Sequence, residues 1–315
     1  MKSSQTERGE SMILSANAKI NLFLDITSRR PDGYHEIQSV MQTVSLSDTV
    51  EVLRIPEGIE LSGNLPFLSY GENNLAYRAA AVFLASLKER ENAPLGGIRI
   101  HLEKRIPLEA GLAGGSADAA AVLRGMNALY GTPFETEELC RIGKRIGADV
   151  PFCIVGGTKA ISGIGDLISP SAPMPDALLV IAKRGTGVST PAAYGALDRL
   201  YDNFDIGKGY IPHSDTLEIL KRGLGAGDLL ETCNGFYNIF ESVVLKEHEG
   251  AAFLKDALLR KGAIAAMMSG SGPSVFGVFR DIDAAESAAK ELNRPSKDAV
   301  AFVARPVGEP GIEKC

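Results

Sequence analysis

Apolar and β-branched residues dominate the first part of the chain. Between Met12 and about Leu61 they gather in the segments NLFLDI, IQSVMQTVSL and TVEVL, and the sequence Arg30-Pro31-Asp32-Gly33 interrupts them. Residues of this type favour strands, whereas proline and glycine mark turns. We therefore expect this region to form β-strands with a turn at the interruption.

A helical period follows. After Asn74 the sequence LAYRAAAVFLASLKER places Leu75, Ala79, Phe83 and Leu87 at helical spacing, with basic residues near its end. This pattern predicts an amphipathic helix. Beyond it, Ile98, Ile100 and Leu102 alternate as in a strand, and the chain passes through Pro107 and a glycine-rich bend into the alanine-rich stretch ADAAAVLRGMNAL. The order is strand, loop, helix.

The next periodic segment predicts a helix from Glu135 to about Ile146. It is followed by GADVPF, whose glycine and proline disfavour continued helix, so we expect Asp149 on a loop. A run of proline and serine from Ser169 to Pro175 marks the expected boundary between two domains, residues 1–172 and 173–315. Residues 1–11 are polar, and we expect them to form a loose tail.

The second half of the chain alternates apolar runs with helical patterns. ALLVIAK, IAAMMSG, VFGVF and AVAFVARP are typical of strands, and AAESAAKELN is typical of an amphipathic helix. This mixture predicts an α+β domain, so the fold class expected for the whole chain is α+β.

Composition narrows the range of partners. The chain has 315 residues, 45% hydrophobic and 23% charged, which is enough for two globular cores. Its formal net charge of −6 argues against a general grip on nucleic acid. The sequence contains neither a signal-peptide pattern nor an apolar run long enough for a bilayer, and its four scattered cysteines show no metal-ligand spacing. We therefore expect a cytoplasmic protein with reduced thiols and no membrane partner.

The strongest candidate for chemistry is the glycine-rich bend PLEAGLAGGSADAA, which holds Gly111, Gly114, Gly115 and Ser116. Glycines let backbone N–H groups approach an anion, and the helix expected to start near Ser116 adds unpaired N–H groups and a positive dipole end. Neither the Walker pattern nor the dinucleotide fingerprint is present. The alternative is a glycine turn in which Ser116 simply caps a helix.

Two further polar residues interrupt apolar sequence. Lys19 and Asn21 lie within AKINLFL, and a buried lysine requires a carboxylate or phosphate partner. Asp149, among apolar residues on its expected loop, is the natural candidate and could orient or deprotonate a hydroxyl. The alternatives are that Lys19 faces solvent and that Asp149 only ends a helix.

Two small-residue or aromatic segments complete the set. SGSGPS, from Ser269 to Ser274, joins two strands and is longer than a tight hairpin needs, so a ligand or the first domain can approach it; a flexible hairpin loop is the alternative. Tyr34 and His35 offer a ring to stack on a base and an imidazole to hydrogen-bond, although such residues are more often ordinary surface or core positions. Two other glycine-containing segments, Gly223–Gly227 and Gly163–Gly165, have no phosphate context.

The chain resembles the GHMP kinases, the superfamily of galactokinase, homoserine kinase and mevalonate kinase. Four segments carry the resemblance, in this order: AKINLFLDITSRRPDGYHEI, PLEAGLAGGSADAA, GADVPF and SGSGPSVFGVF. RRPDGYHEIQSVMQTVSLSD resembles in particular the branch that phosphorylates the 2-hydroxyl of 4-diphosphocytidyl-2-C-methyl-D-erythritol in the non-mevalonate isoprenoid pathway. The likeness runs from about Leu14 to Val303. It implies an N-terminal domain like the second domain of ribosomal protein S5, a ferredoxin-like C-terminal domain, and ATP with Mg²⁺ as cofactors.

The resemblance also implies roles for individual residues. Lys19 and Asp149 match the catalytic pair. The residues that match the substrate side, where a cytidine diphosphate group would bind, are Asn21, Tyr34, His35, Thr190 and Tyr194. The residues that match the ATP site are Asn74, Lys104, Pro107, Gly111, Leu112, Ala113, Gly114, Gly115 and Ser116. Some relatives have glycine where this chain has Glu109, Ala110 and Ala113, which leaves the conformation of the loop open.

Two rival functions stay open at this point: a GHMP kinase for another small alcohol, and a non-catalytic nucleotide-binding regulator. Tyr34 and His35 argue against the first, because mevalonate and sugars carry no base to stack upon, and the presence of both Lys19 and Asp149 argues against the second. The sequence does not distinguish a monomer from a homodimer.

Overall fold

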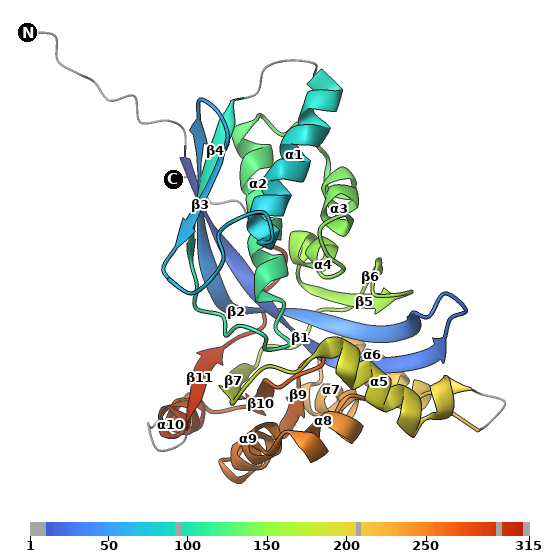
Figure 1. Cartoon of the computed structure of the whole chain (residues 1–315). Coiled ribbons are helices and arrows are strands. Elements are labelled where there is room, and N and C mark those ends of the chain that lie inside the picture. The colour runs from blue at the N-terminus through green and yellow to red at the C-terminus, as the bar shows by residue number, and fades with distance from the viewer. Residues whose placement is uncertain (1–10, 92–95, 206–208, 294–297, 311–315) are drawn as a thin grey trace, which may run out of the picture.

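The computed structural model describes residues 11–91, 96–205, 209–293 and 298–310. Residues 1–10 of the expected tail and Cys315 lie outside the described residues. Ser11 already belongs to the first strand, so the tail was predicted one residue too long. Figure 1 shows the chain as two groups of helices, one beside each of two sheets, with the long strands β1 and β2 running between the groups.

The first sheet is built on β1 and β2, two long antiparallel strands in the region where strands were expected, and the predicted segments IQSVMQTVSL and TVEVL both belong to β2. The two strands are joined by the predicted Arg30–Gly33 turn and followed along the sheet by shorter strands, in the order β3-β4-β2-β1-β8, with β5 pairing with β2 and β6 with β5. The bounds are β1 Ser11–Arg29, β2 His35–Ile55, β3 Ile59–Gly63, β4 Gly97–Glu103, β5 Thr158–Ser162, β6 Leu167–Pro170 and β8 Tyr237–Asn238.

Burial along β1 changes halfway. Its first residues alternate between buried and exposed, as in a strand with one solvated face, but every residue from Ala18 to Ile26 is buried, so this part of the strand is covered on both faces. The N-terminal half packs on the core of the first helical group, whereas Ile20 and Leu22 pack in a core shared with the second sheet. Lys19 and Asn21 therefore lie where the two halves of the molecule meet.

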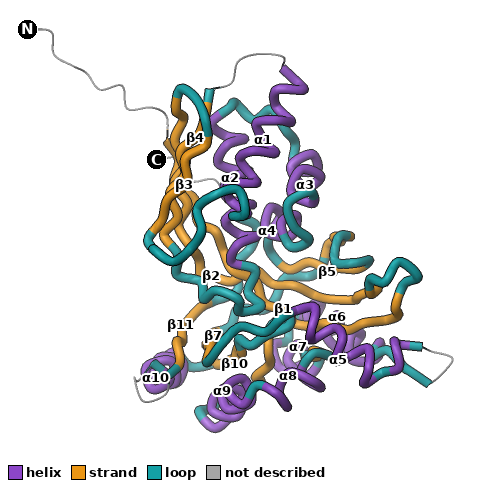
Figure 2. Tube along the Cα trace, in the orientation of Figure 1, coloured by secondary structure: helices purple, strands orange, loops and turns teal. Residues whose placement is uncertain are grey.

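The first helical group covers one face of this sheet (Figure 2). It comprises α1 Leu75–Glu91, α2 Gly114–Leu129, α3 Thr136–Lys144 and α4 Val150–Val155. The expectation that GADVPF is non-helical was wrong beyond Asp149, since α4 begins at the next residue. Pro151 occupies its first turn, where the missing N–H has no intrahelical partner to lose.

The second sheet is antiparallel, in the order β11-β7-β10-β9. With helices between β7 and β9 and helix α10 between β10 and β11, this is the βαββαβ arrangement of a ferredoxin-like domain. The strands are β7 Leu178–Arg184, β9 Ala265–Met268, β10 Val275–Phe279 and β11 Ala299–Ala304. The helices are α5 Thr190–Leu200, η1 Asp202–Phe204, α6 Ser214–Ala226, α7 Leu229–Asn234, α8 Glu241–Glu247, α9 Glu249–Arg260 and α10 Ile282–Leu292.

The expected α+β architecture is confirmed in both halves, and β8 joins them because this short strand of the second half pairs with β1. Cys140, Cys153 and Cys233 carry free thiols, as expected. None of the helices that the structure describes has the length and apolar composition needed to cross a bilayer.

Candidate active site

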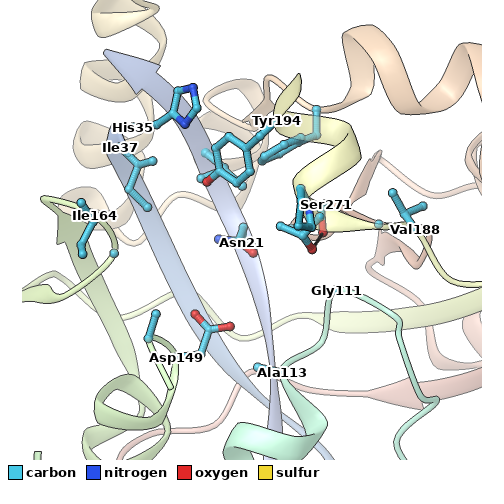
Figure 3. Close-up of a pocket in the computed structure, with 18 of the residues that line it drawn as sticks. Asn21, His35, Ile37, Gly111, Ala113, Asp149, Ile164, Val188, Tyr194 and Ser271 are labelled. Atoms are coloured by element: carbon cyan, nitrogen blue, oxygen red, sulfur yellow. Dashed lines mark hydrogen bonds between the residues drawn. The ribbon is translucent and has the colours of Figure 1, made fainter. Parts of the chain in front are cut away.

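A cavity of about 850 Å³ lies where β1, the starts of α2 and α4, helix α5 and the loop between β9 and β10 meet. Segments far apart in the sequence converge here, and in Figure 3 the Asp149 carboxylate and Ser271 face the space around Asn21 from different sides. The predicted site residues that line the cavity are Lys19, Asn21, Tyr34, His35, Gly111, Ala113, Ser116, Asp149, Thr190 and Tyr194.

The glycine-rich bend leads directly into α2. The helix begins at Gly114, two residues before the predicted start, and Ala113 occupies its N-cap position without a side-chain cap. The first amides of a helix have no acceptor within it, and those of Gly114, Gly115 and Ser116 make no backbone hydrogen bond to any residue that the structure describes. The positive end of α2 therefore carries unpaired donors, the arrangement that binds phosphate in other folds.

Two residues of this loop that are not glycine adopt a backbone conformation that favours glycine. Ala113 has φ 57° and Glu109 has φ 48°, both in the left-handed region that favours glycine. Two of the three positions at which relatives carry glycine thus adopt a backbone suited to glycine. The loop keeps this shape in spite of its side chains, at a local cost in strain.

A second loop packs against the bend. Ser269 Oγ donates a hydrogen bond to the Gly111 carbonyl over 3.1 Å, and a Cβ placed on Gly111 would lie 2.1 Å from the Ser269 carbonyl oxygen. The segment Ser269–Ser274 therefore approaches the first half of the molecule, as its length suggested, and it brings Ser271 to the cavity wall. Glycine at position 111 is needed for this close approach.

Lys19 is 4% exposed and does not lie on a solvent face. Its ammonium donates to Asn21 Oδ1 over 2.7 Å and to the Gly111 carbonyl over 3.0 Å. The pairing of β1 with β2 shifts register between Asn17 and Lys19 and again between Asn21 and Phe23. Such irregularities re-aim side chains, and here they flank the two polar residues of an otherwise apolar strand.

Asp149 precedes α4 and lines the cavity. A Cβ placed on Gly147 would lie 3.9 Å from Ser116 Oγ, so the turn that carries Asp149 lies against the first turn of α2. The expected direct ion pair between Lys19 and Asp149 is absent from the contacts among described residues, where the lysine is held by neutral oxygens instead. The two side chains line one cavity without touching, which leaves room between them for a reacting group.

The aromatic side of the cavity is built around His35. Its ring stacks on Tyr194 with centroids 4.7 Å apart, and its Nε2 lies 2.7 Å from Asp198 Oδ1. Tyr34 is 61% exposed, free to stack on a ligand. Burial and the charge of Asp149 raise the pKa of Tyr194 to about 12, so its hydroxyl stays protonated.

Asp198 was not predicted from the sequence, although its spacing from Tyr194 could have indicated it. Asp198 follows Tyr194 by four residues on α5, so the two side chains share one face of that helix. Thr190, at the start of α5, lies with its Oγ1 2.8 Å from Ser271 Oγ and links the helix to the second loop.

The remaining predicted nucleotide contacts are not on the cavity wall. Asn74 caps α1, accepting a hydrogen bond from the Ala76 amide over 3.0 Å. The Lys104 ammonium is buried between the carboxylates of Asp48 and Asp118. The wall also omits Pro107, Leu112, Gly114 and Gly115. The roles of these residues toward ATP stay predictions.

The buried cluster of Asp48, Lys104 and Asp118 ties the strand side of the bend to α2. Asp48 Oδ1 also accepts from the amides of Arg105 and Ile106, whereas Asp118 Oδ1 has no hydrogen-bond partner among the residues that the structure describes. Burial raises the pKa of Asp118 to about 7, and the attraction of Lys104 offsets this only in part. One lysine thus serves two buried carboxylates.

No group of three or more His, Cys, Asp or Glu side chains among the described residues could hold a metal ion by itself. The cavity does offer the oxygen atoms of Ser116 and Asp149. Mg²⁺ accepts one or two protein oxygens when phosphates and water complete its shell, so this donor set fits the ion together with a nucleotide.

Two protein-family models match parts of this chain, and several known proteins are similar to most of it. The model of the GHMP kinases N terminal domain matches residues 74–157, and that of the GHMP kinases C terminal domain matches residues 218–298. A 4-diphosphocytidyl-2-C-methyl-D-erythritol kinase of Clostridium tetani is 42% identical over 89% of this chain and 95% of its own length. One of Clostridium botulinum (strain Alaska E43) is 40% identical over 94% of this chain and all of its own.

Solved structures give the same result. The crystal structure of a 4-(cytidine 5'-diphospho)-2C-methyl-D-erythritol kinase superposes with a TM-score of 0.76 at 30% identity, covering 94% of this chain and all of that one. An L. major mevalonate kinase in complex with R-mevalonate has a TM-score of 0.74 at 15% identity, covering 99% of this chain and all of that one. The second likeness shows a shared fold alone.

Proposed function

The chain belongs to the GHMP kinase family, and we propose that it transfers the γ-phosphate of ATP to the 2-hydroxyl of 4-diphosphocytidyl-2-C-methyl-D-erythritol. The products are the 2-phosphate and ADP. This is the step in non-mevalonate isoprenoid synthesis that its relatives at 38–42% identity are named for.

One observation carries the proposal. A single cavity holds the bend before α2, Lys19, Asp149 and the His35–Tyr194 pair. These are the parts that phosphoryl transfer to a nucleotide-bearing alcohol needs: donors for phosphate, a group for the hydroxyl proton, and a flat surface for a base.

Phosphoryl transfer depends mainly on position and charge. The hydroxyl oxygen attacks the γ-phosphorus, the bond from that phosphorus to the β–γ bridging oxygen breaks, and ADP leaves with the electron pair. Asp149 accepts or orients the hydroxyl proton. Two of the three Lys19 N–H donors are used by Asn21 and Gly111, so the third is free for a phosphate oxygen or the hydroxyl.

Mg²⁺, when bound with the nucleotide, would neutralise charge on the phosphate oxygens. Ser116 Oγ and the Asp149 carboxylate are the cavity oxygens suited to it. The unpaired amides at the start of α2 would hold the phosphates themselves.

On the substrate side, we propose that Tyr34 stacks on the cytosine ring and that His35 lies beside its polar edge, backed by Tyr194 and Asp198. The exposure of Tyr34 supports this, since a ring packed into the core could not receive a base. Asn21 is fixed between Lys19 and Ser39 Oγ, so its amide is held at the middle of the cavity. We also propose a domain boundary near residue 172, between the end of β6 at Pro170 and the start of β7 at Leu178.

The test is ADP release from ATP with the cytidine diphosphate substrate, mevalonate or galactose as acceptor. Turnover with the first alone is expected. Turnover with another acceptor would assign a different alcohol, and none with any would favour a nucleotide-binding regulator.

Replacing Asp149 tests the mechanism. Asp149→Asn should lower kcat about 10² to 10⁴-fold, the usual range for acid–base groups, and should leave the affinity for ATP measured without Mg²⁺ nearly unchanged. Asp176→Asn is the matched control, because Asp176 pairs with Arg305 on the surface away from the cavity. Retained turnover in Asp149→Asn would remove this carboxylate from the reaction.

A further inference from the structure

A second cavity, of about 960 Å³, lies between α2, α3, α4 and the β5–β6 hairpin, and Glu309 and Pro310 close one side. It is separate from the active site: the two cavities share no lining residue, and α4 stands between them. Asp149, just before α4, lines the first, whereas Pro151, Ile154 and Val155 line the second. Nothing in the proposed reaction uses this space.

Arg124 on α2 lines this cavity and is 7% exposed. Its Nη2 donates to the Ser15 carbonyl over 3.1 Å, and its Nε has no hydrogen-bond partner in the described ranges of the chain. A guanidinium has five N–H donors, and within the described part of the chain no carboxylate pairs with this one. Burial accordingly lowers its pKa.

Two lysines on the wall of the same cavity each have an acidic partner, unlike Arg124. Lys144 pairs with Asp166 over 2.6 Å and Lys159 with Glu309 over 2.8 Å, both on the wall of the same cavity. Of the cations on this wall, Arg124 alone is deeply buried, and it forms no ion pair with any described residue, although Glu135, Glu137, Asp166 and Glu309 also line the cavity. Burying an unpaired cation is costly, so an arginine placed at such a point requires an anion to balance it.

The other residues of the cavity wall indicate what kind of molecule carries that anionic group. Beside the charged rim they include the apolar side chains of Phe134, Leu139, Ile154 and Ile168. The volume exceeds what an inorganic ion fills and is of the size that holds a small organic ligand.

We propose that this second cavity binds a small organic oxyanion, its phosphate or carboxylate group against Arg124 and its apolar body against the wall formed by α3, α4 and β6. A guanidinium binds both groups through paired N–H donors. This inference is independent of the proposed reaction.

Cys140 provides a local probe. It lines the second cavity, is half-buried, and burial raises the pKa of its thiol to about 11, whereas Cys153 and Cys233 are buried. The experiment uses the full chain carrying Cys315→Ser, at pH 9 and with saturating ADP to fill the active site. The rate at which a thiol reagent labels Cys140 is measured with phenyl phosphate, benzoate or uncharged benzyl alcohol.

One or both anions should slow the labelling of Cys140, about tenfold when nine sites in ten are filled, and benzyl alcohol should not. Protection by phenyl phosphate alone assigns a phosphate ligand, and protection by benzoate assigns a carboxylate. Arg124→Met should abolish protection, and Arg145→Met, which removes an exposed arginine outside the cavity, should keep it.

The unliganded stability provides a second measurement. Because Arg124→Met removes an unpaired buried charge while keeping an unbranched side chain that matches the arginine stem from Cβ to Nε, it should raise the thermal midpoint without ligand. The anion that protects Cys140 should raise the midpoint of the parent but not of the variant. The proposal fails if neither anion protects Cys140 in the parent chain, if benzyl alcohol protects equally, or if Arg124→Met is protected as well as the parent.

Discussion

Gly111 joins the two loops of the active site, and Gly111→Ala tests that contact. The position has φ 73°, and an added Cβ would lie 2.1 Å from the Ser269 carbonyl oxygen. The left-handed backbone costs an alanine about 1 to 2 kcal/mol, reduced by the lower entropy of the unfolded chain. Overpacking against a backbone oxygen adds about 1 to 3 kcal/mol, so we expect a total loss of about 2 to 4 kcal/mol.

Two control glycines separate these terms. Gly131 has φ 79° and nothing within 4 Å of an added Cβ, so Gly131→Ala carries only the backbone cost, about 1 kcal/mol. Gly225 lies in α6 with open space around it, and Gly225→Ala should stabilise by about 0.5 to 1 kcal/mol. The free energy of unfolding is measured by urea denaturation on all three variants.

Gly111→Ala should also impair catalysis, because the Gly111 carbonyl holds the Lys19 ammonium. A displacement of about 1 Å can lower turnover on the order of 10²-fold. If Gly111→Ala proves no less stable than Gly131→Ala and retains full activity, the two loops do not meet as the structure has them.

Three further changes test the site and its support. Asp118→Asn should flatten the pH dependence of the free energy of unfolding. The pKa of this carboxyl is about 7 in the native state and 3.8 in the unfolded state, so its contribution to stability declines as pH rises between these values. Urea unfolding at several pH values measures the change. Asp198→Ala should raise KM for the cytidine substrate more than it lowers kcat, because His35 loses the partner that orients its ring, and equal changes in both constants would contradict this role. Ala113→Gly should preserve or raise stability by up to about 1 kcal/mol, because it removes a left-handed alanine, and a clear loss in thermal unfolding would mean that the methyl group packs productively.

Local pattern was sufficient for most of the elements. Residues of period two and of helical spacing predicted strands in the region of β1 and β2, the strand β4, the helix after Asn74 and an α+β second half, whereas the ferredoxin-like arrangement was implied by the family resemblance. The main local error was α4, because proline was read as a helix breaker although the first helical turn tolerates it.

Ten of the residues named for the site from sequence line one cavity, but their contacts were not predicted. The glycine-rich bend, Lys19 and Asp149 were identified because their residue types are unusual for their surroundings, and the resemblance to the GHMP kinases supplied the aromatic side. Sequence could not show that Lys19 binds Asn21 and a carbonyl in place of Asp149, nor that Lys104 is enclosed by two carboxylates.

Several contacts of the site join residues more than 50 positions apart, such as Asp48 with Lys104 or Gly111 with Ser269. Periodicity and propensity act over a few residues and determine which segments are strands or helices and which faces are apolar. Only the packing of the two sheets around β1 decides which loops meet and which charges are paired. It also leaves Arg124 buried with no ion pair to any described residue.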